Sequence, residues 1–108
     1  MTKADQSHER AFRERVKAKQ LGPQVESMRA ELGFSQVMLA SRLGISFVSV
    51  SRWERGHLVP TGLHDATLRL LRDAILHSGG KKVARALDAC SHDQAEVLRA
   101  LVRLGGDR

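Results

Sequence analysis

The sequence predicts an all-α fold, a compact bundle of short helices, and three observations support this prediction. Apolar residues recur every three or four positions along most of the 108 residues, as they do on one face of a helix. No segment alternates apolar and polar residues in the way that marks a half-buried strand. Glycines and capping residues separate the periodic stretches, so each stretch is expected to be one helix.

The first 21 residues are basic and hold few apolar side chains. They contain six Lys or Arg and three Asp or Glu. Phe12 and Val16 are four apart and permit a short helix, but we expect a mobile, solvated arm that could also touch phosphates or a partner protein. Gly22-Pro23 is expected to break the chain and to start the first helix of the bundle, since proline is tolerated at the first helical position.

Three short helices are expected next. Gly33 suits a left-handed cap at the end of the first. Ser35 is a good N-cap for the second, which stops at Gly44. Ser46 caps the third, which runs from residue 47 to about 55. The positions expected to face inward are all apolar: Val25, Met28, Leu32, Leu39, Ala40, Leu43, Val50 and Trp53.

Three further helices are expected toward the C-terminus. The fourth opens at Thr61 or Gly62, carries a broad apolar face and stops at Ser78-Gly79-Gly80. A short fifth helix follows it. Ser91 and Gln94 match the capping box of a sixth helix.

Composition limits the classes of function. Lys and Arg total 18 against 12 Asp and Glu, which gives a net charge of +6 and favours a polyanionic partner, nucleic acid first and an anionic membrane second. No apolar run of about 18 residues could span a membrane, so we expect no membrane partner. Cys90 is the single cysteine, so an intrachain disulfide is impossible and a cytoplasmic location is expected.

Catalytic and metal sites are not expected. The five histidines lack the i, i+4 spacing of a helical zinc site, and Cys90 with His92 supplies only two ligands. Cys90 has no third group that would make it a nucleophile, and no glycine-rich phosphate loop appears. The sequence therefore predicts a protein that is not an enzyme and that needs no cofactor and no metal.

The stretch from Gln36 to Trp53 carries the functional signal. Two short helices joined by a tight turn need a small residue where they touch and a residue that tolerates positive φ in the turn; Ala40 and Gly44 occupy these positions. From Ser35 through Trp53 there are two arginines and no acidic residue. A surface that lies against phosphates should lack carboxylates in this way.

The sequence here reads Ser35-Gln36-x-x-Leu39-Ala40-x-x-Leu43-Gly44-Ile45-Ser46, then Val50-Ser51-Arg52-Trp53-Glu54-Arg55-Gly56 and Pro60. With these residues the chain resembles the lambda-repressor and Cro type of helix-turn-helix, also called the xenobiotic-response-element (XRE) family. The resemblance covers about residues 22–76. It implies a bundle of four or five helices that binds duplex DNA, usually as a dimer, with the helix from Ser46 to Arg55 in the major groove.

The resemblance also implies roles for individual residues. Gln36 matches a glutamine that contacts a phosphate and braces the recognition helix. Arg29 and Glu54 match an arginine and a glutamate that form a largely buried ion pair. The positions that fall where family members touch DNA are Gln36, Ser46, Phe47, Val48, Ser51 and Arg52.

Two departures from the family pattern matter. Met38 stands where the family often has Glu, so the capping box from Ser35 is missing. Phe47 and Val48 are apolar where some members have amides that bond bases. They could contact a thymine methyl group, or pack locally as a staple at the helix start. Direct hydrogen-bond readout then falls mainly to Arg52.

The sequence thus predicts a sequence-specific DNA-binding regulator, a homodimeric repressor that recognises a double-stranded operator. An alternative is an autoregulating antitoxin that also neutralises a cognate toxin, and a second is a helical adaptor that binds RNA or acidic protein. Three parts are expected: the arm 1–21, the DNA-binding domain 22–77 and a helical extension 78–108. The extension is expected either to form the dimer contact or to complete the monomer core through Val83, Leu87, Leu98, Leu101 and Val102.

Overall fold

The structure, a computed structural model, describes residues 3–90 and 93–106, which are helical over most of their length. The helices are α1 (Lys3–Leu32), α2 (Gln36–Leu43), α3 (Phe47–Glu54), α4 (Gly62–Ser78), α5 (Gly80–Ala89) and α6 (Gln94–Leu104). No strand occurs among these described residues, so the all-α prediction is confirmed. None of the helices found there is both long and apolar enough to cross a membrane.

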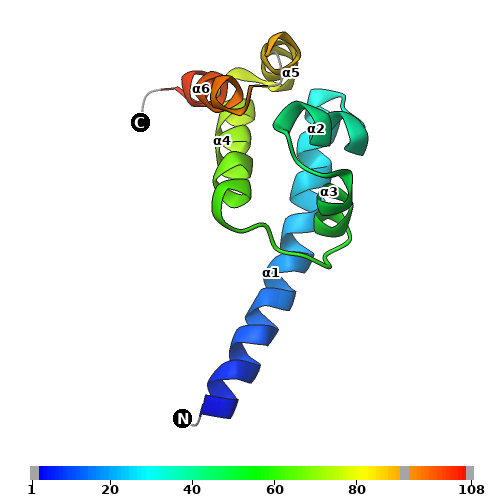
Figure 1. Ribbon diagram of the computed structural model, residues 1–108, viewed down its shortest axis with the longest axis vertical. Helices are drawn as coiled ribbons and strands as arrows, with labels where there is room; N and C mark the ends of the chain where they lie inside the picture. Colours follow the sequence, from blue (N-terminus) through cyan, green and yellow to red (C-terminus); the bar gives the residue numbers. More distant parts are fainter. Residues whose placement is uncertain (1–2, 91–92, 107–108) are drawn as a thin grey trace.

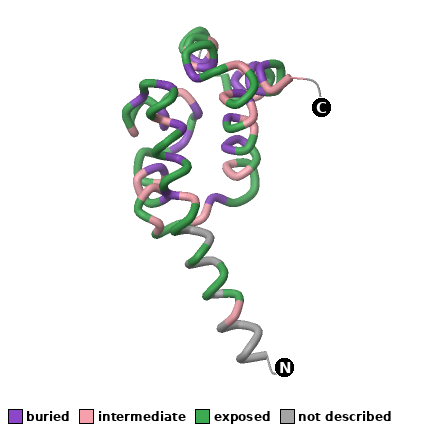
Figure 2. Tube along the Cα trace, turned by 180° about the vertical axis from the view of Figure 1, so that it is seen from behind, coloured by how far each residue is buried: buried purple, intermediate pink, exposed green. Residues whose placement is uncertain are grey.

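The bundle is organised around the long helix α1. Figure 1 shows α2 and α3 on one side of α1 and α4 on the other, with α5 and α6 across one end. The N-terminal part of α1 projects from the opposite end, which makes the molecule elongated, with extents of 51 × 30 × 22 Å. Buried residues lie on the inner faces of the bundle, whereas the described side chains of the projection are mostly exposed (Figure 2).

The break predicted at Gly22-Pro23 is wrong, because α1 continues through both residues. Gly22 does not form a turn, and its role is to allow close packing between α1 and α3. A Cβ atom added to Gly22 would lie 2.5 Å from the carbonyl oxygen of Glu54 and 3.1 Å from that of Trp53. The missing side chain therefore lets α1 approach the backbone at the end of α3. Whether residues 1–21 move as an arm stays a prediction.

Capping fixes the ends of the short helices as predicted. The Ser35 hydroxyl accepts a hydrogen bond from the Met38 N–H at 3.1 Å, and the Ser46 hydroxyl accepts one from the Ser49 N–H at the same distance. Gly44 ends α2 with φ 68°, a left-handed conformation that glycine adopts without steric cost.

The predicted start of α6 is wrong. Its N-cap is Asp93, whose carboxylate accepts a hydrogen bond from the Ala95 N–H at 2.9 Å. Asp93 thus holds the N-cap position that was expected for Ser91, which lies outside the described residues. The N-cap of α6 is therefore two residues later in the sequence than predicted, at another side chain that can accept a hydrogen bond.

The C-terminal extension belongs to the same core as the helix-turn-helix. Val83, Leu87 and Leu101 are fully buried against it, so these three residues complete the monomer core and are not available for a dimer contact. Leu98 is half-buried, and Val102 alone of the five predicted contact residues is well exposed, at 57%. A Cβ atom on Gly80 would collide with the Glu31 carbonyl group, so α5 begins in close contact with α1.

Candidate nucleic-acid interface

A three-residue turn sets the angle between α2 and α3. Gly44 takes the left-handed conformation, and the Ile45 N–H donates a hydrogen bond to the Ala40 carbonyl oxygen at 2.9 Å. Ile45 is buried, with 8% of its surface exposed, and Ala40 is buried beneath it on α2. The turn is therefore fixed by backbone bonding and by packing rather than being a free linker.

The inner face of α3 is anchored in the core. Val50 and Trp53 are almost completely buried. The Trp53 ring also packs edge-to-face on the His64 ring of α4, with centroids 5.6 Å apart and planes at 69°. Because one face of α3 is held by α1, α2 and α4, its other face is presented in a fixed position.

The outer face of α3 holds most of the residues predicted to touch DNA. Phe47, Val48, Ser51 and Arg52 lie at positions i, i+1, i+4 and i+5, which share one side of a helix. Phe47 and Val48 are 47% and 54% exposed, Arg52 is exposed and Ser51 is half-buried. The structure thus brings these side chains to one surface, while their contacts with DNA stay predictions.

The predicted ion pair between Arg29 and Glu54 is present and is bidentate. Arg29 Nε lies 2.6 Å from Glu54 Oε2, and Nη2 lies 2.8 Å from Oε1. The remaining guanidinium nitrogen donates to the Phe34 carbonyl oxygen at 3.0 Å. The Glu54 side chain is 6% exposed and that of Arg29 is 20% exposed. This contact joins α1, the turn after it and the last residue of α3.

Gln36 takes part in the same network. Burial by itself raises the pKa of the Glu54 carboxyl, but hydrogen bonds from Arg29 and Gln36, together with the Arg29 charge, outweigh burial and leave that pKa below its ordinary value of 4.5. Gln36 therefore ties the first residue of α2 to the last residue of α3. The family resemblance implied a bracing role and a phosphate contact for Gln36, and both roles stay predictions.

Ser46, also a predicted contact residue, is exposed at the start of α3 but already bonded within its own turn. Its hydroxyl donates to the Ser49 hydroxyl at 2.9 Å while accepting the Ser49 N–H. The only O–H of Ser46 is therefore used inside the protein. The other exposed side chains at this end of α3, Phe47 and Val48, are apolar.

The sequence did not reveal that Arg42, the other arginine of the helix-turn-helix stretch, forms an ion pair. Its Nε lies 2.7 Å from Asp88 Oδ1 on α5, and its guanidinium lies 5.9 Å from the centre of the Phe34 ring. No local signal could reveal this pair, because the partners are 46 residues apart. The side chain of Arg52, in contrast, has no hydrogen bond or ion pair with the part of the chain that the structure describes. It is left as the free cation of α3.

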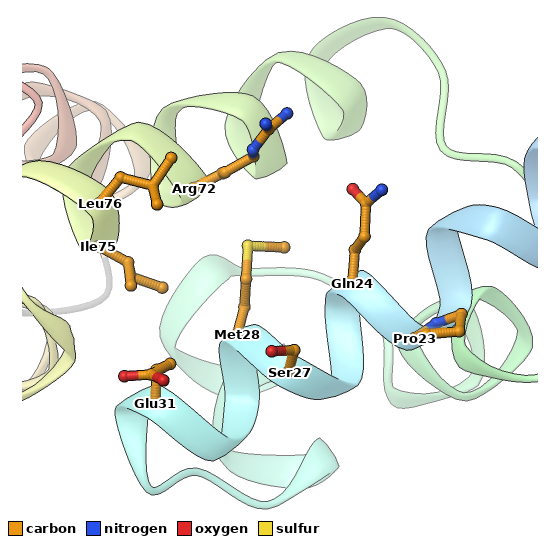
Figure 3. A pocket seen from close by; sticks show the side chains of 8 residues that line it. All are labelled: Pro23, Gln24, Ser27, Met28, Glu31, Arg72, Ile75 and Leu76. Atoms are coloured by element: carbon orange, nitrogen blue, oxygen red, sulfur yellow. The ribbon is translucent and has the colours of Figure 1, made fainter.

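A groove of about 610 Å³ lies between α1 and α4, away from the outer face of α3. Figure 3 shows Met28 and Gln24 of α1 opposite Arg72 and Leu76 of α4. Its walls mix apolar side chains with charges of both signs. This groove is therefore distinct from the acid-free surface of α2 and α3.

Comparison with known proteins agrees with this geometry. A family model described as helix-turn-helix matches residues 25–64, which reach from the second half of α1 to the start of α4. No curated protein and no solved structure matches the chain. Residues 25–64 therefore form a DNA-binding helix-turn-helix domain of the lambda-repressor and Cro type, the XRE family.

Proposed function

We propose that this protein is a sequence-specific repressor that binds its operator as a homodimer, with α3 in the major groove of each half-site. The observation that supports this best is the division of α3 into two faces. Val50 and Trp53 are buried in the bundle, while the opposite face exposes Phe47, Val48 and Arg52 and leaves Ser51 half-buried. The absence of acidic side chains from Ser35 through Trp53 favours a phosphate-rich partner.

Each residue class has a separate task in this proposal. The N-terminus of α2, with Gln36, lies on a phosphate and sets the register of the domain on the duplex. Arg52 offers two parallel N–H donors to O6 and N7 of a guanine. A dimer reads two half-sites about 34 Å apart, which supplies the specificity that one half-site lacks.

Selection from a random duplex pool, followed by titration of an Arg52→Ala variant, tests the proposal. The wild type should enrich a sequence that it prefers over a scrambled duplex by at least about a thousandfold. Loss of base reading by Arg52→Ala should cost about 1–3 kcal/mol on the selected duplex and little on the scrambled one. Arg99→Ala, which removes an exposed arginine of α6, is the matched control and should change neither.

The same titration has two contrary outcomes. Equal losses on both duplexes, with the salt slope reduced by about one, would make Arg52 a phosphate contact. No enriched sequence at all would overturn sequence-specific repression and favour the adaptor that binds RNA or acidic protein.

The projecting part of α1 favours a second candidate, an autoregulating antitoxin. Phe12 is 60% exposed on this projection and Val16 is 38% exposed, so an apolar side is open to another protein. Co-expression with the product of the neighbouring reading frame is the test. Phe12→Asp should abolish neutralisation of a toxin and leave DNA binding intact, and a neighbouring product without toxicity would exclude this role.

A further inference from the structure

The first turn of α3 is unusual in what it exposes. Phe47 and Val48 are large apolar residues, yet about half of each is open to solvent. A local staple at the helix start would explain such residues only if they were buried by it. Their exposure therefore calls for another explanation.

The positions of a hydrophobic staple are in fact occupied by other residues. With Ser46 as N-cap, the residue before the cap is Ile45 and the fourth helical residue is Val50. Ile45 is 8% exposed and Val50 is fully buried, and both belong to the core. Phe47 and Val48 are therefore not required to fix the start of α3.

Hydrogen-bond readout is also limited at this end of the helix. The Ser46 hydroxyl already donates its hydrogen bond to the Ser49 hydroxyl. Neither Phe47 nor Val48 carries a side-chain donor or acceptor. In the major groove the thymine C5-methyl is the apolar group that distinguishes one base pair from the others. An exposed apolar turn on a recognition helix matches that group and no other feature of the groove.

We infer that Phe47 and Val48 are specificity-determining residues that recognise a thymine by packing on its C5-methyl group in each half-site. The inference rests on the proposed function, because it requires α3 to enter the major groove. It adds that readout is divided along α3, with methyl recognition at the first turn and guanine recognition by Arg52 one turn later. Removal of one contacted methyl should weaken binding about fourfold, as expected for burial of one methylene-sized group.

Uracil scanning of the selected duplex tests this inference. Each thymine is replaced singly by deoxyuridine, which removes the methyl group and leaves the Watson–Crick pair unchanged. For the wild type, at least one position in each half-site should show the fourfold loss at fixed salt. The same loss should disappear in Val48→Ala or Phe47→Ala, because the contact is already missing there.

Leu63→Ala is the matched control, since Leu63 of α4 is 50% exposed and Phe47 is 47% exposed. This variant should bind normally and keep the full uracil effect. Because all three side chains are exposed, their thermal midpoints should stay within about 2 °C of the wild type, so folding does not confuse the result.

The inference is overturned if no thymine shows a uracil effect, or if the effect persists undiminished in both Phe47→Ala and Val48→Ala. These outcomes leave the proposed function standing, since a preferred duplex has been selected before the scan begins. A pool that yields no preferred duplex overturns the proposed function and this inference together.

Discussion

At the scale of single residues, Glu54 connects the parts that hold the recognition helix. It ends α3, receives two hydrogen bonds from Arg29 of α1 and is bonded by Gln36 of α2. Its side chain is nearly buried, so loss of one partner strands the other charge. Glu54 therefore links the end of α3 to both α1 and α2.

Glu54→Ala is expected to destabilise the protein strongly. Breaking a buried pair costs about 3–5 kcal/mol, which lowers Tm by more than about 10 °C in a domain of this size. Circular dichroism melting curves measure the change, with Glu31→Ala, an exposed carboxylate of α1, as the control. An unchanged midpoint in Glu54→Ala would show that the pair contributes nothing to stability.

The same residue predicts a pH dependence. The pKa of Glu54 is lowered by folding, so its stabilising contribution is complete above the ordinary value of 4.5 and is lost as the pH falls through the lower folded value. The difference in Tm between wild type and Glu54→Gln should therefore be largest near neutral pH and shrink in acid. Melting curves from pH 7 down to about pH 3 measure it, and a constant difference would contradict the assigned cause.

At the scale of elements, the contact of α1 with α3 decides the geometry of the interface. Alanine in place of glycine inside a helix ordinarily stabilises it by about 0.5–1 kcal/mol. Gly22→Ala should do the reverse, because its Cβ would meet the Glu54 carbonyl oxygen at 2.5 Å. We expect a loss of about 1–3 kcal/mol from overpacking, measured by urea unfolding.

Gly105→Ala provides the comparison for this prediction. Gly105 has φ −75°, and an added Cβ would come no closer than 3.4 Å to its neighbours. Its substitution should change the free energy of unfolding by no more than about 0.5 kcal/mol. Equal effects at the two glycines would mean that α1 does not approach α3 as closely as described.

The projection of α1 has a separate prediction. Arg10 and Lys19 are exposed on it, and Arg13 is held by Glu9 in an exposed ion pair that contributes little. If these cations meet phosphates, deletion of residues 1–19 should flatten the salt dependence of DNA binding by about 0.9 per lost contact and weaken selected and random duplexes alike. If the projection serves a partner protein instead, the deletion leaves the slope unchanged.

At the scale of the whole molecule, the proposed function requires a surface through which two chains form a dimer. A stable interface buries about 800 Å² per partner, which is roughly a tenth of the 7121 Å² that one chain exposes. The exposed apolar residues outside α2 and α3 include Leu76 of α4, at 72%, and Val102 of α6. Either could lie in such an interface, since neither contributes to the monomer core.

Light scattering at high micromolar concentration is expected to give twice the chain mass of 12.0 kDa without DNA. If the extension carries the contact, Val102→Glu should shift the mass toward the monomer and Leu76→Glu should not. The opposite pattern would place the contact at the groove between α1 and α4. A monomeric wild type at this concentration would contradict a stable dimer.

The sequence by itself determined α2, α3 and the ends of these helices. Ser35, Gly44 and Ser46 act on backbone groups within four residues of themselves, so their effect is readable locally. It also determined that residues 47, 48, 51 and 52 share a face, because helical spacing requires it. The pair of Arg29 with Glu54 was accessible only through the family pattern, since 25 residues separate them.

The tertiary structure alone decided how these elements are used. The helix continues through Gly22-Pro23, and Gly22 packs on the end of α3, a contact between residues about 30 positions apart. Arg42 forms an ion pair with Asp88 of α5 and is therefore not a free cation. Val83 and Leu101 belong to the core of the monomer because α5 and α6 pack against the helix-turn-helix. Local patterns specify backbone conformation, whereas burial and pairing depend on which distant residues the fold brings together.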